Sequence, residues 1–409
     1  MSSPLNVLIA GGGVAGLEAL LALSRLAAHR VRVTLLTPER EFVYRPMSVA
    51  TPFARGRATR HELPRIAAAL DAELLEGELA EVDVPGRVAL TADGSRVAFD
   101  ALLVAVGAAS EPALSRVPTW TPELDQEVFG GLLRDLEEGY SRRVAFVVPP
   151  GATWPLPAYE LALMTAWDAR DMGRDDIAVT VYTPEPSPLA MFGAAAGEAL
   201  AGDLAEVGVD VRTGVKVRED AAAPKRLVAD PGGRPLDVER VIALPRAAAR
   251  SIPGVPVDER GFIRVDAHGR ADGADGVWAA GDAIAFPIKQ GGLAAQQADA
   301  AAESIAAHAG AAVEPQPFRP VLRGVLLTGR GRQWIRRDLD EDEGSAERHA
   351  LWWPPTKVAG RYLAPYLLSL EEDQDAERPT GQLVELDASR DVPAVTEAMD
   401  AARRQAGER

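Results

Sequence analysis

Apolar and amphipathic segments alternate over the first part of the chain. NVLIA (6–10) and VRVTLLT (31–37) are short apolar runs of the length typical of buried strands. Between them, LEALLALSRLAAH (17–29) follows a glycine-rich turn and repeats its apolar residues at helical spacing. Strand, helix and strand in this order predict a βαβ unit.

The same order of elements recurs in the middle of the chain. RRVAFVV (142–148) and DIAVTVYT (176–183) have strand character, and YELALMTAWDA (159–169) between them has helical character. DALLVAVGA (100–108) predicts a further buried strand that ends at a glycine, and the best domain boundary lies near residue 120. Two βαβ units are therefore expected.

After the second unit, the chain again has elements like those of the first unit, and short strands follow them. A strand and an alanine-rich helix are predicted within 277–310, and short strands at 321–329 and 333–339 precede a charged stretch, 340–349, that is expected to be a solvated loop. The tail beyond Glu371 is polar, with helical character from Ala394 onward.

These elements predict an α/β fold with two Rossmann-like dinucleotide-binding domains plus a C-terminal cap. The first domain is expected to be split into 1–120 and 249–320, with the second domain at 121–248 inserted between its parts. Residues 321–409 form the cap and the polar tail.

Net charge and hydropathy limit the classes of binding partner and the cellular location that can be expected. The net charge of −16 and the isoelectric point near 4.9 argue against nucleic acid and against attraction to anionic lipid. No basic leader precedes the first strand, and no run of ~18 or more apolar residues occurs, so a soluble cytoplasmic protein without a transmembrane segment is expected.

The sequence contains no cysteine, which removes several chemistries. No disulfide, thiolate nucleophile, zinc–thiolate site or iron–sulfur cluster can form. The five histidines are scattered without metal-ligand spacing, so no metal site is expected. Nearly all basic residues are arginine. A lysine that is kept in such a chain therefore indicates a position where lysine and arginine would act differently.

A phosphate-binding motif lies in the first unit. Its residues follow the first strand and open the first helix as G-x-G-x-x-G: Gly11, Gly13, Val14, Ala15 and Gly16. Glycine lets the backbone approach a pyrophosphate, and the helix N-terminus supplies unpaired N–H groups and partial positive charge. A dinucleotide site is therefore predicted at this turn.

Glu39 lies just past the second strand, where a carboxylate is needed to accept the hydroxyl groups of the ribose. Glu41 is close enough in the sequence to compete for this role.

Two later segments indicate which dinucleotide binds. VWAAGDAIAFP (277–287) resembles the glycine–aspartate motif of two-dinucleotide-domain flavoproteins, in which the aspartate binds the flavin ribityl chain; Gly281 and Asp282 match it. DALLVAVGA is similar to their "ATG" segment, where Gly107 matches and Val106 replaces the threonine. The resemblance implies FAD at the N-terminal site.

Over most of its length the chain resembles the pyridine nucleotide-disulfide oxidoreductase superfamily, with its FAD/NAD(P)-binding fold. The similar branch holds sulfide:quinone reductases, flavocytochrome c sulfide dehydrogenase flavoproteins and type II NADH dehydrogenases. FVYRPMS (42–48) is similar to their loop beside the flavin ring, which implies that Arg45 and Pro46 pack at the ring, unless they form only a structural turn.

PIKQGGLAAQQA (287–298) is similar to the segment whose helix N-terminus points at the pyrimidine end of the flavin. This resemblance implies cofactor contacts from Gly291, Gly292 and Leu293, and a helix dipole that stabilises the anionic reduced flavin.

Lys289 matches the lysine near the flavin and quinone of sulfide:quinone reductases, which implies a cofactor contact and a catalytic role; an exposed loop lysine is the alternative. Gln296 matches the second of two glutamines near the quinone of type II NADH dehydrogenases. Gly292 occupies the position of the first glutamine, so the resemblance does not directly imply the same quinone site in this chain.

The second unit departs from a nucleotide cradle. Its turn, VVPPGATWPLPAYE (147–160), carries one glycine, Gly151, among four prolines. Proline removes N–H donors and fixes φ, and without further glycines the backbone cannot approach a phosphate closely. The sequence therefore leaves both alternatives, a turn that binds NAD(P)H and one that does not.

The segment LWWPPTKVAGRYLAPYLLSL (351–370) has two interpretations. Its position in the similar branch implies a quinone channel or an amphipathic segment peripheral to the membrane. Packing over the flavin domain or across a homodimer interface is the alternative.

The function expected is that of an FAD-dependent oxidoreductase. Electrons would pass from NAD(P)H or another small reductant through the flavin to a quinone or other acceptor. Without cysteines, the persulfide mechanism of sulfide:quinone reductases is excluded. The alternative is a non-catalytic flavin-binding sensor or interaction protein with a decayed NAD site.

Overall fold

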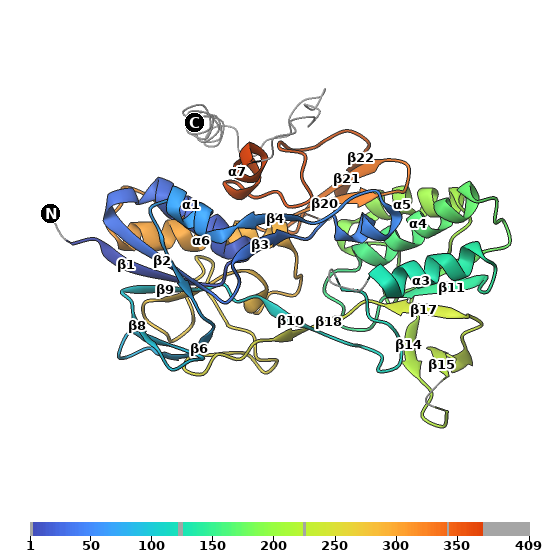
Figure 1. Cartoon of the computed structure of the whole chain (residues 1–409), viewed down its shortest axis with the longest axis horizontal. Coiled ribbons are helices and arrows are strands. Elements are labelled where there is room, and N and C mark those ends of the chain that lie inside the picture. The colour runs from blue at the N-terminus through green and yellow to red at the C-terminus, as the bar shows by residue number, and fades with distance from the viewer. Residues whose placement is uncertain (1–2, 122–125, 224–225, 342, 371–409) are drawn as a thin grey trace.

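The computed structural model describes residues 3–121, 126–223, 226–341 and 343–370. Figure 1 shows two α/β lobes side by side, one containing the N-terminal segments and the other the green central segments. The orange-red segments beyond residue 320 lie across the top of both lobes, while the orange helix at 291–308 belongs to the first lobe (Figure 1).

The first lobe is built on a five-stranded parallel sheet. Its order is β19 (Val277–Ala279), β9 (Ala101–Val104), β1 (Leu5–Ala10), β2 (Val31–Thr37) and β5 (Glu73–Glu76). Because β19 follows the whole second lobe in the chain, the first sheet is assembled from two distant parts of the sequence. The residue limits predicted for the four domain segments, 1–120, 121–248, 249–320 and 321–409, stay predictions.

Both faces of this sheet are covered. Helices α1 (Val14–Leu26) and α6 (Gly291–His308) pack together on the face that carries Val7 and Ile9. The other face of β1 packs on an antiparallel sheet of β6 (Leu79–Asp83), β7 (Val88–Thr91) and β8 (Arg96–Ala98). Burial on both faces explains why the strands are continuously apolar rather than alternating.

Further short elements surround the first lobe. A two-stranded ribbon pairs β3 (Glu41–Tyr44) with β4 (Thr59–Glu62), and α2 (Leu63–Ala69) follows it. The antiparallel pair β10 (Ala108–Glu111) and β18 (Arg246–Ala249) carries the chain out to the second lobe and back.

The second lobe contains a four-stranded parallel sheet. Its order is β13 (Asp210–Arg212), β12 (Ala178–Tyr182), β11 (Arg143–Val147) and β17 (Arg240–Ala243). The remaining elements are α3 (Gln126–Glu137), α4 (Leu156–Asp171), α5 (Ala194–Glu206), β14 (Lys216–Glu219), β15 (Leu227–Asp230) and β16 (Arg234–Pro235). Both predicted Rossmann-like units are present, which confirms the α/β fold class.

The cap consists of an antiparallel sheet, β20 (Val321–Leu327), β21 (Arg332–Asp338) and β22 (Gly344–Glu347), followed by α7 (Leu363–Leu370). The prediction of a solvated loop at 340–349 was wrong, because β22 lies inside it and pairs with β21. The predicted tail helix from Ala394 lies outside the described residues.

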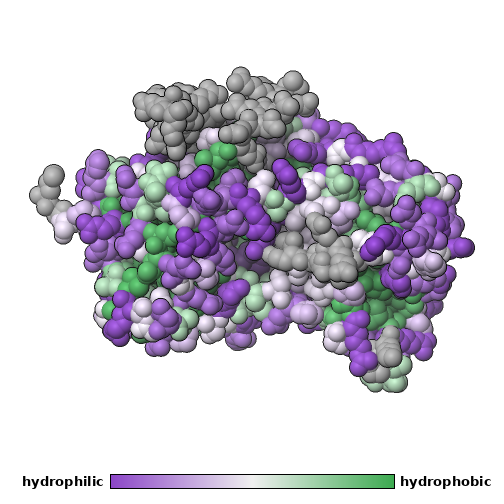
Figure 2. All heavy atoms as spheres, viewed as in Figure 1, coloured by the Kyte–Doolittle hydropathy of each residue, from purple (hydrophilic) through white to green (hydrophobic). Residues whose placement is uncertain are grey.

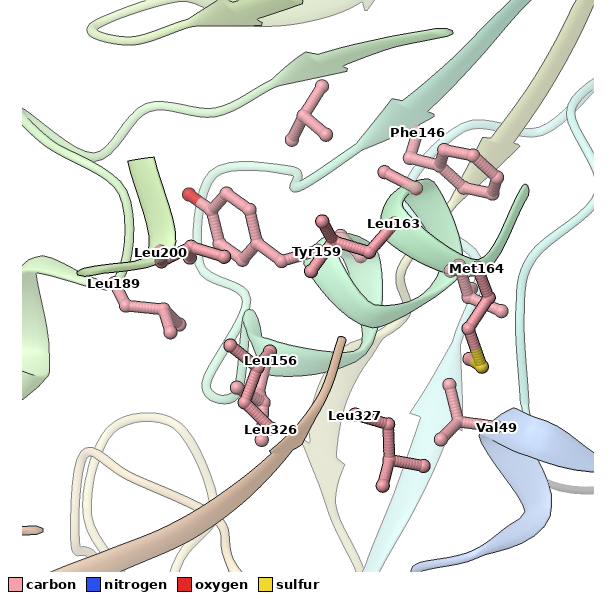
Figure 3. Close-up of a cluster of buried hydrophobic side chains, with 14 of the residues drawn as sticks. Val49, Phe146, Leu156, Tyr159, Leu163, Met164, Leu189, Leu200, Leu326 and Leu327 are labelled. Atoms are coloured by element: carbon pink, nitrogen blue, oxygen red, sulfur yellow. The ribbon is translucent and has the colours of Figure 1, made fainter. Parts of the chain in front are cut away.

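Helix α4 lies at the centre of the second hydrophobic core. Every residue from Leu156 to Ala166 is buried, because β11, β12, β20, α3 and the 3-10 helix Ser48–Phe53 pack against the helix. Figure 3 shows Tyr159 and Leu163 of α4 among Phe146, Leu189, Leu200 and Leu326. Each buried leucine contributes about 1.5–3 kcal/mol of transfer free energy, so α4 and the cap are stabilised together.

No helix within the described ranges combines the length and the apolar character that crossing a bilayer would require.

Candidate functional site

The carboxyl ends of β1, β2, β9 and β19 meet at one edge of the first sheet, and the predicted cofactor residues follow these ends. Gly11 has φ +119°, and a Cβ there would lie 2.2 Å from the Ala105 carbonyl oxygen. A Cβ on Gly16 would lie 1.8 Å from the oxygen of Gly11. Side chains are therefore excluded at both positions.

Gly13 differs, because a Cβ there would meet nothing within 4 Å. It is the N-cap of α1, which begins at Val14, so open space lies in front of the first turn of the helix. The close-packed and open glycines together fit a pyrophosphate at the helix N-terminus. Ala15 packs behind the turn, 3.0 Å from the Cβ that Gly281 would carry.

Glu39 lies at the rim of this edge and is exposed. The Thr37 hydroxyl donates a hydrogen bond of 3.0 Å to Glu39 Oε2. A hollow of about 650 Å³ is lined by Glu39, Arg40, Glu41, Val43, Arg60, Glu62 and Pro64. Glu41 accepts a 2.9 Å hydrogen bond from Arg60, so Glu39 is the carboxylate better placed for a ribose.

Asp282 and Lys289 lie beyond the end of β19. Burial raises the pKa of Asp282, while the nearby Lys289 cation acts in the opposite direction. Lys289 is only 8% exposed; its ammonium group donates to the Ile284 carbonyl oxygen and lies 3.9 Å from the centre of the Phe262 ring. Burial lowers the pKa of Lys289 to about 8. Lys289 is therefore not an exposed loop lysine, and its catalytic role stays a prediction.

The start of α6 is tied to the cap by two glutamines. Gln290 accepts a 2.8 Å hydrogen bond from the Leu293 N–H as the helix cap and donates to the Arg323 carbonyl oxygen at 3.1 Å. Gln296 donates to the carbonyl oxygens of Gly292 and Val321 and accepts from the Val321 N–H. Since both amide atoms of Gln296 are used, this side chain joins the cap to α6 and does not face a ligand.

Residues 351–363, which we call the C-terminal strap, approach the same region. The Val358 N–H donates a 3.0 Å hydrogen bond to the Tyr44 hydroxyl. A Cβ on Gly291 would lie 2.7 Å from a methyl group of Val358. The strap therefore brings the loop after β3, with Arg45 and Pro46, together with the first turn of α6.

Arg45 has a structural role in that loop. Its carbonyl oxygen accepts hydrogen bonds from the N–H and the hydroxyl group of Ser48, at 2.8 and 2.7 Å. These bonds fold the turn that leads into the 3-10 helix Ser48–Phe53. Packing of Arg45 and Pro46 against a flavin ring stays a prediction, as do the contacts expected from Gly107, Gly292 and Leu293.

The second lobe presents a different turn at the corresponding sheet edge. Helix α4 begins at Leu156 with Pro155 as its N-cap and Pro157 in its first turn, and no side chain caps it. Trp154 packs edge-on against Phe192, with ring centres 5.8 Å apart. Pro157 has no N–H group, so this helix N-terminus has one donor fewer for an anion.

A carboxylate that the sequence analysis missed follows β12. Thr183 donates a 2.9 Å hydrogen bond to Glu185, repeating the arrangement of Thr37 and Glu39. Tyr159, which is fully buried, donates a further hydrogen bond of 2.6 Å to Glu185 Oε2. Burial raises the pKa of both Tyr159 and Glu185. The tripeptide Thr-Pro-Glu also occurs at 121–123, but at 37–39 and 183–185 it begins at the last residue of a predicted strand, and this shared position is the signal that could have found Glu185.

Comparison with known proteins extends over both lobes. The family model described as pyridine nucleotide-disulphide oxidoreductase matches residues 5–304. The chain is 28% identical over 309 residues to the ferredoxin reductase component of a chlorobenzene dioxygenase from Cupriavidus sp. (strain PS12), covering 70% of this chain and 69% of that protein. The matched family region ends inside α6, before the cap begins.

Solved structures share the fold at low sequence identity. The sulfide:quinone oxidoreductase of Aquifex aeolicus superposes with a TM-score of 0.75 and 18% identity, covering 84% of this chain and 86% of that one. A ferredoxin reductase from Rhodopseudomonas palustris gives a TM-score of 0.59 and 19% identity, with 81% of each chain covered.

Proposed function

The chain belongs to the pyridine nucleotide-disulphide oxidoreductase family and is on that ground an FAD-dependent oxidoreductase, for which we propose a narrower function. We propose that a small reductant other than NAD(P)H reduces the flavin and that a quinone reoxidises it. The protein holds the cofactor and tunes its charge, and the redox chemistry belongs to the flavin.

The hydrogen bond from Tyr159 to Glu185 carries the proposal about the donor. In a dinucleotide site, the carboxylate after the second strand accepts the ribose hydroxyl groups. Here the Tyr159 hydroxyl already donates to Oε2 of that carboxylate from a fully buried position in α4, so the carboxylate has fewer acceptor positions left for a ribose. The proline-rich turn ahead of α4 supports the same conclusion, since it offers few N–H donors to a pyrophosphate.

The absence of cysteine implies that the donor reduces the flavin directly. The chain has no cysteine, so a dithiol or persulfide relay between donor and flavin is chemically impossible. The donor must therefore transfer a hydride or electrons to the flavin itself.

A quinone acceptor is supported by how well one solved structure superposes. The sulfide:quinone oxidoreductase structure has a TM-score of 0.75, against 0.59 for the ferredoxin reductase structure, at similar coverage of this chain. An iron–sulfur protein is the second candidate acceptor, and the ferredoxin reductase component among the relatives favours it.

The acceptor is tested with flavin that has been reduced by dithionite. The reduced protein is mixed anaerobically with a short-chain quinone or with an oxidised ferredoxin, and the return of flavin absorbance is followed. Reoxidation within seconds by the quinone alone supports the proposal. Fast reoxidation by ferredoxin alone would assign the second candidate, and no reoxidation by either would favour a non-catalytic flavin-binding sensor.

A further inference from the structure

A hollow of about 840 Å³ lies beside β17, the edge strand of the second sheet. The segment after β10, helix α3, the β14–β15–β16 sheet and β17 all contribute to its lining. Figure 2 shows apolar surface, in green, where β14, β15 and β17 lie in Figure 1. We call this cavity the β17 hollow, and its larger apolar lining residues are Val117, Leu132, Leu227, Leu236, Val241 and Ile242.

The hollow exists because a neighbouring segment covers only one end of the outer edge of β17. The Ala243 N–H donates a 3.0 Å hydrogen bond to the Pro118 carbonyl oxygen, and the Ala243 carbonyl oxygen accepts one of 2.8 Å from the Trp120 N–H. Within the described residues this edge pairs nowhere else, so residues 240–242 border the hollow. Half-buried apolar side chains such as Leu236 and Val241 are left partly open to solvent there.

Two exposed arginines, Arg116 and Arg226, line the same hollow. The Arg116 N–H donates to Glu219 Oε1 at 3.2 Å, which fixes its main chain on β14. The Arg226 N–H donates to the Ala223 carbonyl oxygen at 2.8 Å, just before β15 begins. In the part of the chain that the structure describes, neither guanidinium group forms an ion pair. Two positive charges at the hollow are therefore available to a ligand.

The acidic groups that line the hollow are engaged by other partners. Asp135 of α3 accepts two hydrogen bonds from Arg240, at 2.5 and 3.0 Å. Glu239 accepts the N–H groups of Arg142 and Arg143, at 2.6 and 3.1 Å. Because donors already compensate both carboxylates, the two unpaired guanidinium groups make the hollow suitable for an anion.

The lining chemistry specifies the kind of ligand. A largely apolar cavity of this volume with a few polar groups is typical of sites for small organic molecules. Arginine binds carboxylates through paired N–H groups, so a carboxylate head group matches the two arginines. The net charge of −16 repels anions in general, so an anion that binds here is held by local contacts.

We propose that the β17 hollow binds a small amphipathic carboxylate. Its head group contacts Arg116 and Arg226, and its apolar body packs on Leu236 and Val241. All lining residues lie at 116–135 or at 223–242, so the hollow is separate from the candidate flavin site and from the turn ahead of α4. The proposal does not rest on the donor or the acceptor proposed above.

The test is calorimetric titration of the FAD-loaded protein with octanoate. Octanoate should bind at one site, whereas octanol and acetate should bind at least about 10-fold more weakly, since each lacks one half of the ligand. In the double variant Arg116→Gln/Arg226→Gln, octanoate binding should weaken by about 10- to 100-fold while octanol binding stays unchanged.

Two further variants separate the head group from the apolar body. Leu236→Gln should weaken octanoate and octanol alike, by about 3- to 10-fold. Arg234→Gln changes an exposed arginine of β16 that does not line the hollow, so this control should bind octanoate as the wild type does.

The proposal is wrong if octanoate gives no saturable heat, or if acetate binds as tightly as octanoate. It is equally wrong if the double variant keeps the wild-type affinity, because octanoate would then bind elsewhere on the protein. Should the double variant fail to fold, the single variants Arg116→Gln and Arg226→Gln decide, each with an expected loss of about 3- to 10-fold. None of these outcomes changes the test of the electron acceptor.

Discussion

Tyr159 donates a hydrogen bond of 2.6 Å to Glu185, the residue that repeats in the second lobe the position of Glu39 in the first. Each glutamate follows a threonine and a proline at the end of its strand. Glu39 lines an open hollow, whereas Glu185 is bound by a buried phenol. Two similar units thus differ in the donors that their carboxylates already accept.

Removing that phenol hydroxyl should weaken the fold without opening the site. Tyr159→Phe keeps the ring in the core and loses one hydrogen bond to a carboxylate, so the free energy of unfolding should fall by about 1–3 kcal/mol. Urea denaturation measures the change. Tyr140→Phe, at a side chain that is 75% exposed, is the control, and an equal loss in both variants would refute the assigned bond.

Glu39 should matter for FAD affinity more than its neighbour Glu41. Glu39→Gln removes a carboxylate acceptor for ribose hydroxyl groups, so the dissociation constant for FAD should rise by about 10- to 100-fold. Calorimetric titration of the deflavinated protein measures it. Glu41→Gln should change little, because Glu41 is engaged by Arg60. A larger effect at Glu41 would reverse the assignment.

Lys289→Ala should lower the midpoint potential of the flavin by roughly tens of millivolts, because a cation near the reduced ring is lost. Burial lowers the pKa of Lys289 to about 8. The ammonium form therefore dominates below that pH, and the difference from the wild type should be largest there and shrink above it. Lys216→Ala, on β14, is the control. An unchanged potential in Lys289→Ala would remove this residue from the site.

The buried ion pair between Glu160 and Lys357 should show strong coupling. Glu160→Gln or Lys357→Met alone leaves one buried charge without its partner, at a cost of about 3–5 kcal/mol. The double variant removes both charges and should recover much of that loss. Thermal unfolding of the four proteins measures the cycle, and strictly additive losses would contradict a direct interaction.

Most of the helices and strands could be predicted from the sequence. Strand β2 has the predicted bounds, 31–37, because an apolar run between polar ends is a strong signal. Helix α4 begins at Leu156, earlier than the predicted 159, because proline is tolerated in the first turn of a helix. Strand β22 was missed, since its short run of mostly small, half-exposed residues follows four consecutive acidic residues and resembles a loop.

The site was accessible only where a motif reports it. Gly11, Gly13 and Gly16 follow a spacing imposed by the backbone near a phosphate, so one sequence suffices to find them. The contact from Glu18 to Tyr362 joins residues 344 positions apart, and no local pattern records it. The same holds for Tyr159 and Glu185, whose pairing depends on how α4 packs beside β12.

The electron donor that we propose for the flavin is a small molecule other than a nicotinamide dinucleotide. The most direct measurement mixes the FAD-loaded protein anaerobically with NADH, NADPH, sulfide or a quinol and follows the flavin absorbance. NADH and NADPH should leave the flavin oxidised, while one of the small donors should bleach it within seconds. Rapid bleaching by NADH or NADPH would instead show that a nicotinamide dinucleotide is the donor.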